Sequence, residues 1–461
     1  MASRKKCKML KDVTIVRDGD NIQLIYDSVE MEPIPTGFDL SSLSEPLRSF
    51  MEYYTIRKHS PGNQVIDLTK LVLPEMVSRI NEYQVKTIDR LVNYLHGRGI
   101  VTLKPGKGKT LVSVLASRFY NDKCLFVTPA NKRNDFVEEM KKWTGEDMVV
   151  LTSKNIGETL PPSRCYVVSY DIAKREKSIF SRVWDTVILD EAHYIKGNDT
   201  LVAEMVKMIV IKSKHAILMS GTPLVSAPPD LYNLLYAIHP RVFKNHTDFC
   251  CRYAGAVLQG TKLVVGKNTN TKELHIIFNE FVANPPERGE VNNNSTYGAM
   301  SYEHGQYGKF TRIFKYLDIP RTIQMPNRVL TSNRFDNNIE TTRVRRETNL
   351  IKQQFIYPHA IEEIKSIPNG ECGLFFFQHI ELLNAFVEVV NGLGIDFVVV
   401  HGKTSGKVRA EAFKKIANAE VRVGILTCRT SGTGLNLAPG ATRVYFMELP
   451  WTPSEITQSE S

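Results

Sequence analysis

A glycine-containing loop restricts the folds open to this chain more than any other stretch. It reads Lys104-Pro105-Gly106-Lys107-Gly108-Lys109-Thr110, and it lies between the apolar run Ile100–Leu103 and a helical pattern that begins at Leu111. In such a loop backbone N–H groups can converge on an anion, and the helix N-terminus adds partial positive charge. Lys109 would reach the β- and γ-phosphates, and the Thr110 hydroxyl would complete a Mg²⁺ shell. Leu103 stands where the pattern asks for a small residue, so the loop alone is compatible with a phosphate site or a basic turn.

The length and the charge of the chain favour a multidomain protein with a polyanionic partner. The 461 residues suggest roughly three domains. The net charge of +10 favours nucleic acid as the partner. Seven cysteines without a CxxC pair predict neither a zinc site nor a disulfide framework, and they fit a reducing, intracellular compartment. No apolar stretch approaches the length of a membrane span, and the basic N-terminus lacks the apolar region of a secretion signal, so we expect neither a membrane span nor secretion.

Short apolar runs alternate with amphipathic segments in two parts of the chain. The predicted strands are 124–127, 148–151, 166–168, 186–189 and 215–219 in the first part, and 374–377, 397–400, 421–426 and 444–447 in the second. This alternation predicts an α/β fold class with two parallel-sheet lobes, each covered on both faces. A hairpin predicted over 13–26 indicates a small β-containing N-terminal module. The predicted domains are an accessory module (1–75), an ATP-binding lobe (76–245), an insertion or hinge (246–354) and a second lobe (355–461).

Chemically useful residues follow three of the strands predicted in the first lobe. Pro129 follows one strand, Asp190 and Glu191 follow another, and the segment Ser220–Pro223 follows a third. Ligands of open parallel sheets bind at the carboxyl ends of the strands, so we expect these residues near the glycine loop. Asp190 can hold Mg²⁺ together with Thr110, and Glu191 can orient and deprotonate an attacking water. The alternative is a surface carboxylate pair that opens a helix, and the upstream Gly-Lys-Thr disfavours it.

The segment Asp190–Gly197, which begins with Asp-Glu-Ala-His (a DEAH box), resembles the Walker B segment of the Swi/Snf family of DNA translocases in helicase superfamily two. Further blocks match in the family's order, and they are Tyr83-Gln84, Val127–Trp143, Val168–Asp171, Ser220–Pro223 with Asp230–Tyr232, His401–Ser405 with Arg409, Ser431–Leu437 and Trp451–Pro453. The resemblance covers about residues 80–245 and 370–461. In its length and in the Ser220 block the chain is most similar to the annealing-helicase branch.

The resemblance implies two RecA-like lobes that form an ATP-driven translocase on double-stranded DNA, with ATP and Mg²⁺ as cofactors. DNA contacts would be sequence-independent and made to the phosphate backbone, and the protein would act in the nucleus or at a viral replication site. The implied catalytic residues are Glu191, Asp190 and Lys109, and Thr110 and Asp190 would hold the metal. The implied ATP-binding residues are Gln84, Gly106, Lys107, Gly108, Lys109 and Thr110. The implied coupling and DNA-contacting residues are Ser220, Thr222, Pro129, Ser431, Gly432, Gly434 and Gln458.

The last residues keep two other interpretations open. Gln458–Ser461 resembles the opening of the family's sixth motif, so the arginine fingers that follow in the family are expected to be missing from this sequence. The loss of such an arginine costs about 10³- to 10⁵-fold in rate. The second interpretation is therefore a protein that binds ATP and DNA but hydrolyses little. The third is a viral-type transcription ATPase, and the oligomeric state stays open in all three.

Overall fold

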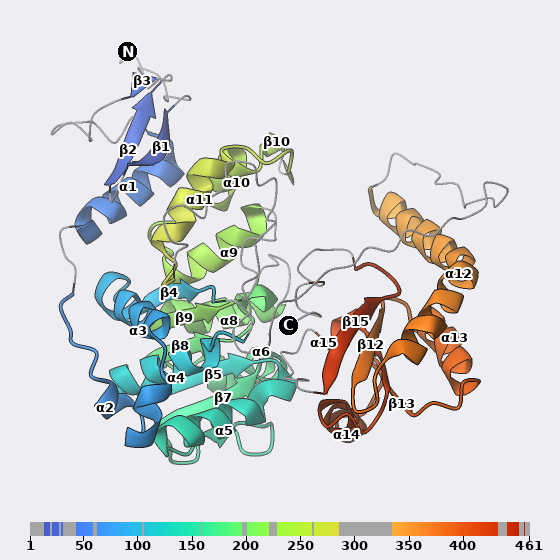
Figure 1. Ribbon diagram of the computed structural model, residues 1–461. Helices are drawn as coiled ribbons and strands as arrows, with labels where there is room; N and C mark the ends of the chain where they lie inside the picture. Colours follow the sequence, from blue (N-terminus) through green and yellow to red (C-terminus); the bar gives the residue numbers. More distant parts are fainter. Residues whose placement is uncertain are drawn as a thin grey trace, which may run out of the picture. The chain divides into compact units, whose positions relative to one another are not determined.

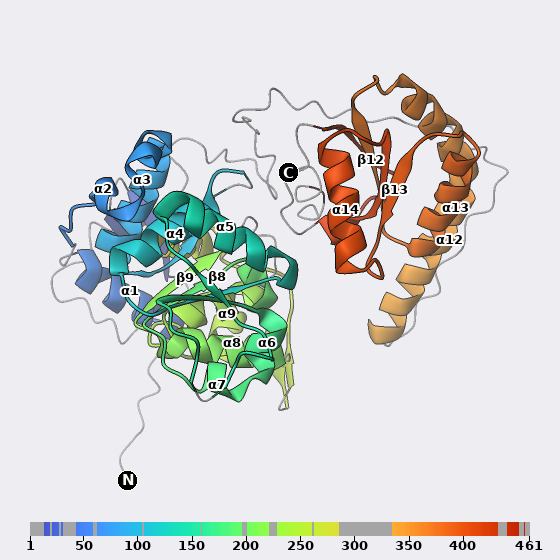
Figure 2. The same cartoon turned by 90° about the horizontal axis from the view of Figure 1, so that it is seen from below.

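The chain forms two compact units, residues 1–298 and 299–461, in the computed structural model (Figure 1). The structure describes residues 13–18, 21–26, 29–30, 43–58, 62–103, 106–157, 159–195, 201–220, 228–260, 262–284, 334–431, 440–450 and 456. Both units place helices on both faces of a sheet, as a second view shows (Figure 2). Among the described residues, no helix combines the length and the apolar character that a membrane crossing needs.

The described part of the first unit contains a six-stranded parallel sheet with the order β4-β9-β8-β5-β7-β6. The strands in this order are Arg98–Val101, His215–Met219, Thr186–Leu189, Cys124–Thr128, Cys165–Ser169 and Val149–Val150. The five strands predicted from the sequence in this unit are confirmed, and their ends differ by no more than one residue. β4, which leads into the glycine loop, ends within the apolar run Ile100–Leu103 that precedes the loop in the sequence, so a strand before the loop is confirmed as well.

Side chains that alternate along the strands fill two separate cores. On β5, Leu125 and Val127 face one core while Cys124 and Phe126 face the other. The first core is covered by α1 (Glu45–Lys58), α6 (Tyr170–Arg175), α7 (Lys177–Phe180), α8 (Leu201–Lys212), α9 (Pro228–Ile238), α10 (His246–Tyr253) and α11 (Thr271–Glu280). The second is covered by α2 (Leu68–Leu71), a 3₁₀ helix (Pro74–Arg79), α3 (Glu82–Asp89) with its π-helical continuation (Arg90–Tyr94), α4 (Lys109–Tyr120) and α5 (Arg133–Thr144). Burial on both faces explains why these strands are continuously apolar in the sequence.

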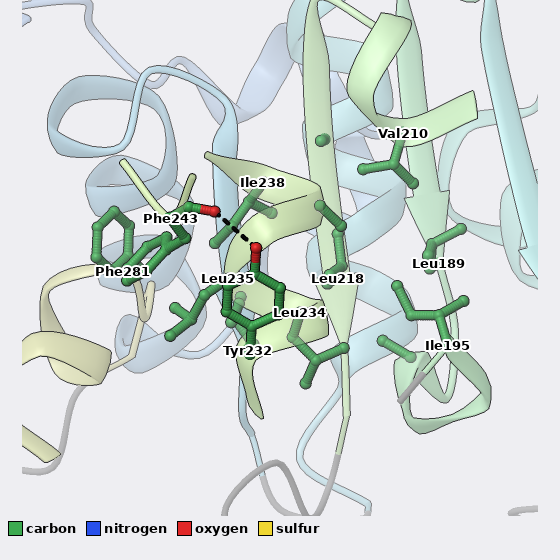
Figure 3. Packing of buried hydrophobic residues seen from close by; sticks show 14 of the residues in the cluster. Leu189, Ile195, Val210, Leu218, Tyr232, Leu234, Leu235, Ile238, Phe243 and Phe281 are labelled. Atoms are coloured by element: carbon green, nitrogen blue, oxygen red, sulfur yellow. Dashed lines mark hydrogen bonds between the residues drawn. The ribbon is translucent and has the colours of Figure 1, made fainter. Parts of the chain in front are cut away.

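The first core is tightly interlocked beneath α9 (Figure 3). Leu189 of β8 and Leu218 of β9 lie at 0% exposure among side chains of α8 and α9. The Tyr232 hydroxyl is also buried, and it donates a hydrogen bond to the Phe243 carbonyl at 3.0 Å. Each buried polar group needs such a partner, because an unpaired one costs roughly 1–3 kcal/mol. β8 and β9, which lead to Asp190 and Ser220, are therefore packed firmly against α8 and α9.

Arg98 fixes the start of β4 against the ends of two helices. Its guanidinium donates to the carbonyls of Val210 in α8 (3.1 Å), Ser213 (2.6 Å) and Ile238 in α9 (2.8 Å). Carbonyls at a helix C-terminus have no partner within the helix and carry partial negative charge, so a cation suits them. β4 is thereby tied to both helices.

The segment after α11 forms an edge beside β4. The Ile100 N–H donates to the Phe281 carbonyl at 2.8 Å, and the Ala283 N–H donates to the Ile100 carbonyl at 2.8 Å. Thr102 N–H then donates to Asn284 Oδ1 at 2.7 Å. A short hairpin of β10 (Val257–Gln259) and β11 (Lys262–Val264) separates α10 from α11. Residues 246–284, which the sequence analysis assigned to an insertion or hinge, are thus folded onto the first unit, and the domain boundaries stay predictions.

The predicted N-terminal hairpin is confirmed. β1 (Val13–Asp18) pairs antiparallel with β2 (Asn21–Tyr26), and β3 (Val29–Glu30) pairs with β2. The helix α1 that follows is not separate from the nucleotide-binding lobe predicted at 76–245. Its residues Leu47 and Phe50 are buried in the first core of that unit.

The second unit contains, in its described part, a four-stranded parallel sheet with the order β13-β14-β12-β15. The strands in this order are Phe397–Val400, Val423–Thr427, Cys372–Phe377 and Ala441–Phe446. α12 (Arg334–Ser366) and α13 (Ile380–Asn391) cover one face, α14 (Gly406–Ala417) covers the other, and α15 is Cys428–Ser431. The four strands predicted in this part of the chain are confirmed. The basic run at 343–346, which falls in the segment predicted as an insertion or hinge, lies within α12.

Candidate active site

The segments predicted to carry chemistry in the first unit end neighbouring strands of one sheet. The glycine loop follows β4, Ser220 follows β9, Asp190 follows β8, and Pro129 follows β5, and these strands are consecutive in the sheet order. Hydrogen bonds bind the strand ends together, because Ser220 N–H donates to the Val101 carbonyl at 3.1 Å and Asp190 N–H donates to the Val127 carbonyl at 2.8 Å. In parallel sheets this edge is where ligands bind.

Two glycines give the loop a conformation that other residues would resist. Gly106 has a φ of +74° and Gly108 a φ of +82°, both in the left-handed region that L-residues rarely adopt. Gly108 is the N-cap of α4, and within the described residues no side chain caps this helix. The first N–H groups of α4 are therefore open to an anion, which the helix dipole also favours.

The buried side chain of Gln84 supports the glycine loop through a hydrogen bond. Its side chain is 4% exposed. Its Oε1 accepts from the Asn81 N–H at 3.0 Å, and its Nε2 donates to the Lys107 carbonyl at 3.1 Å. The Tyr83 hydroxyl donates to the same carbonyl at 3.1 Å. The structure thus shows Gln84 fixing the loop, while its direct contact with a nucleotide stays a prediction.

Lys109 lies in the first turn of α4, beside Thr110. Its ammonium donates a hydrogen bond to the Leu103 carbonyl at 2.9 Å. This bond links the end of the glycine loop to the residue that precedes the loop. Burial lowers the pKa of Lys109, although the charges of Glu191 and Asp190 act in the opposite direction. The two carboxylates are therefore near enough to act on this ammonium.

A lysine that follows β5 joins the carboxylate pair. Lys132 Nζ lies 3.4 Å from Asp190 Oδ2 and 3.2 Å from Glu191 Oε1. The Thr128 hydroxyl donates to the same Asp190 oxygen at 3.3 Å. His193 Nδ1 lies 3.3 Å from the other oxygen of Glu191. Both carboxylates are buried, and Lys132 and Thr128 offset part of the cost of holding negative charge away from water, whereas Glu191 Oε2 and His193 Nδ1 approach each other without forming a hydrogen bond.

Glu191 occupies a strained backbone position. Its φ is +51°, a conformation that costs a non-glycine residue about 1–3 kcal/mol. The turn is held from two sides, because Tyr194 N–H donates to the Glu191 carbonyl at 3.0 Å and the Tyr170 hydroxyl donates to the Asp190 carbonyl at 2.7 Å. Strain of this kind is typical of functional sites, where surrounding contacts enforce a side-chain direction.

Burial and neighbouring charges shift the pKa values of the two carboxylates in opposite directions. Burial raises the pKa of Asp190, although Lys132 opposes that effect. Burial also acts to raise the pKa of Glu191, but His193, Lys132 and Lys109 outweigh it and lower the pKa to about 2. For Lys132, burial is outweighed by the charges of Asp190 and Glu191, so its pKa is raised. Glu191 and Lys132 are therefore ionised at neutral pH.

Some predicted residues cannot be placed, and two important ones were not predicted. Thr222, Gly432, Gly434 and Gln458 lie outside the described residues, and Ser431 is described only as the backbone end of α15.

Sequence reasoning gave no role to Thr128 or Lys132. The strand order could have pointed to them, because β5 adjoins β8 and Val127 pairs with Leu189. Residues that follow β5 must then lie beside those that follow β8.

The residues present suit a nucleotide with a divalent cation. The open N–H groups of α4 and the Lys109 ammonium are donors for phosphate oxygens, whereas the hydroxyl of Thr110 and the carboxylate of Asp190 are hard oxygen ligands for Mg²⁺. The second carboxylate, Glu191, is ionised and can accept a proton. This arrangement defines a phosphate-loop nucleotide-binding protein.

Comparison with known proteins identifies the family. Residues 29–285 match the SNF2-related domain, and residues 357–460 match the helicase conserved C-terminal domain. The chain belongs to the SNF2-related family of helicase-like ATPases. The resemblance stated from the sequence is confirmed, and so is the fold class of two RecA-like α/β lobes.

Two curated proteins are similar to this chain over most of its length. The chain is 24% identical over 403 residues to the human DNA annealing helicase and endonuclease ZRANB3, covering 79% of this chain and 35% of that protein. It is 22% identical over 476 residues to the Xenopus tropicalis SWI/SNF-related matrix-associated actin-dependent regulator of chromatin subfamily A-like protein 1, covering 99% of this chain and 47% of that protein. The chain thus spans between a third and a half of these relatives. Among solved structures, the Sulfolobus solfataricus SWI2/SNF2 ATPase core in complex with dsDNA matches with a TM-score of 0.40 and 18% identity, over 75% of this chain and 77% of that chain.

Replacing Gly108 with alanine is expected to weaken nucleotide binding about tenfold or more, because a Cβ there would lie 2.2 Å from Gln84 Nε2 and would displace the support of the loop. Gly370→Ala is the matched control, because Gly370 has the same φ of +82° but no described atom within 4 Å of such a Cβ. Both variants carry the backbone cost, about 1–2 kcal/mol. Calorimetric titration with ADP measures the difference, and equal affinity in the two variants would contradict this account of the loop.

Proposed function

We propose that the chain is an ATP-driven translocase or remodeller that moves along double-stranded DNA. The observation that carries this proposal is the meeting of Lys109, Asp190 and Glu191 at one sheet edge, in a chain of the SNF2-related family. An ammonium for phosphate, a carboxylate for metal and an ionised carboxylate for water are the groups that ATP hydrolysis requires.

Each residue of the first unit has a separate role in this proposal. The N–H groups from Gly106 to Thr110 and the Lys109 ammonium bind the β- and γ-phosphates. Thr110 and Asp190 would hold Mg²⁺, which neutralises charge on the phosphate oxygens when it is bound. Glu191, which is ionised at neutral pH, accepts a hydrogen bond from the attacking water and orients it, and it is proposed to take the proton of that water. Gln84 holds the loop in place through its hydrogen bond to the Lys107 carbonyl, and it is also proposed to contact the nucleotide base.

The proposed partner is duplex DNA, bound through its phosphates. The net charge of +10 supports this proposal, as does the name of the relative ZRANB3, a DNA annealing helicase. ATP is proposed to bind at the sheet edge of the first lobe, and its hydrolysis is proposed to change how the chain contacts DNA. The residues proposed to couple the two events are Pro129, Ser220 and Thr222 from the first lobe and Ser431, Gly432, Gly434 and Gln458 from the second. The proposed location is the nucleus, and the comparisons lend no support to a viral replication site.

ATP hydrolysis with and without duplex DNA tests the function directly. We expect DNA to stimulate hydrolysis to a similar extent for two duplexes of unrelated sequence. The stimulation should weaken steeply between about 50 and 200 mM salt, because phosphate contacts release counterions. Nucleotide affinity is measured beside hydrolysis. Hydrolysis that ignores duplex DNA would contradict the translocase, and tight binding of ATP and DNA with negligible turnover would favour the binding protein instead.

A further inference from the structure

Lys132 holds a place in the site that the roles assigned above do not use. It ends the short 3₁₀ turn Ala130–Lys132 after β5, and its N–H donates to the Pro129 carbonyl at 3.0 Å. Because β5 lies beside β8 in the sheet, this turn carries the side chain across to the end of β8. The Lys132 side chain is only 12% exposed, which is unusual for a lysine.

The Lys132 ammonium contacts one oxygen of each carboxylate. It lies 3.4 Å from Asp190 Oδ2 and 3.2 Å from Glu191 Oε1, and the two carboxylate side chains are 7% and 11% exposed. Two adjacent carboxylates in such a place repel each other unless a cation lies between them. Lys132 therefore sets the distance and the direction of the two carboxylates relative to each other.

Lys132 contacts the carboxylate of Asp190 that is proposed above to hold the metal, so an ammonium and a metal cation would share one negative charge. A carboxylate oxygen that accepts a hydrogen bond from an ammonium has less electron density and less room for Mg²⁺, which demands close oxygen ligands in a strict octahedral geometry. The Thr128 hydroxyl donates to the same oxygen. Metal binding at Asp190 must therefore compete with the ammonium of Lys132, whereas the contact with Glu191 does not involve the metal.

We propose that Lys132 is a positioning residue that competes with Mg²⁺ for Asp190 and orients Glu191. When nucleotide and Mg²⁺ bind, the ammonium gives up Asp190 and keeps Glu191, so that the water-activating carboxylate is aligned only in the loaded site. Lys132 thus raises the Mg²⁺ concentration that nucleotide binding requires. This inference rests on the proposed function, because it assumes that Asp190 holds the metal.

The Mg²⁺ dependence of ADP binding tests the role of Lys132 without any turnover. ADP affinity is measured by calorimetry in EDTA and across a Mg²⁺ titration for the wild type and for Lys132→Met, Lys132→Gln and Lys132→Arg. Removal of the charge in the Met and Gln variants should lower the half-saturating Mg²⁺ concentration about tenfold, the range of one charge-assisted hydrogen bond. Lys132→Arg, which keeps the charge, should retain the wild-type requirement.

Lys141→Met is the matched control, because Lys141 lies in helix α5, which directly follows the turn that carries Lys132, but pairs with Asp147 on the surface at 2.9 Å. It should leave the Mg²⁺ requirement unchanged. Gln at position 132 preserves a hydrogen-bond donor, so at least one neutral variant is expected to fold. An unchanged Mg²⁺ requirement in a folded neutral variant would overturn the inference and leave the proposed function intact. Failure of the wild type to bind ADP with Mg²⁺ would instead overturn the proposed function.

Discussion

Glu191→Gln is expected to reduce DNA-stimulated ATP hydrolysis by about 10²- to 10⁴-fold, the usual contribution of a general base. Glutamine has the same shape and still offers an oxygen to Lys132, which contacts Glu191 Oε1 at 3.2 Å. It cannot take a proton from water at neutral pH, however. The chemical step should therefore fail while nucleotide binding persists. Hydrolysis is measured by phosphate release with saturating duplex DNA, and ADP affinity is measured by calorimetry.

Two measurements separate this loss from a loss of structure. The variant should keep the wild-type affinity for ADP, since Lys109 and the glycine loop are unaltered. Glu75→Gln, a change at an exposed glutamate of the 3₁₀ helix, should hydrolyse ATP normally. Turnover in Glu191→Gln comparable to that of this control would exclude Glu191 as the base.

Lys109→Met is expected to lower the affinity for ADP with Mg²⁺ about tenfold to a hundredfold, because a charge-assisted contact with phosphate is worth roughly 1.5–3 kcal/mol. ATP hydrolysis should fall further, since the ammonium also stabilises charge on the γ-phosphate. The methionine side chain fills nearly the same space. Calorimetry with ADP and phosphate release with ATP measure the two effects separately.

The stability of this variant gives an independent check. Burial lowers the pKa of Lys109, which means that the folded chain bears a cost for keeping this ammonium charged. Lys109→Met should therefore unfold at the wild-type temperature or above it. Lys86→Met, at a lysine of α3 whose side chain is 70% exposed, is a suitable control. Weak binding accompanied by a marked loss of thermal stability would show that Lys109 is mainly structural.

The sequence predicted the parts of the fold that depend on local pattern. Strands such as Thr186–Leu189 and His215–Met219 are apolar along their whole length because both faces of the sheet are covered, and this signal is visible in single runs. Most of α12 was not predicted, because its polar and basic residues, including the run at 343–346, lack a clear apolar stripe. The packing of 246–284 on the first unit depends on long-range pairing, such as that of Ile100 with Val282.

The candidate site was predictable in its motifs but not in its contacts. A Gly-Lys-Thr and an Asp-Glu pair carry recognisable spacing, so Lys109 and Glu191 could be named from the residues. Lys132 belongs to a turn without a distinctive pattern, and its contact with Asp190 follows only from the adjacency of β5 and β8. Gln84 was expected to face the nucleotide, and that contact stays a prediction; in the structure its Nε2 donates to the loop carbonyl of Lys107, and its Oε1 accepts from the Asn81 N–H at the start of α3.

The left-handed backbone at Glu191 has a consequence for how this chain responds to selection. Asparagine and glycine accept a φ near +51° more readily than glutamate does, and neither adds a charge to the buried pair. Replacing Glu191 would relieve the backbone strain, but it would also remove a carboxylate whose ionised form His193, Lys132 and Lys109 stabilise in the folded chain. Strain and charge therefore act on stability in opposite directions at this position, whereas a library screened for ATP hydrolysis should retain glutamate.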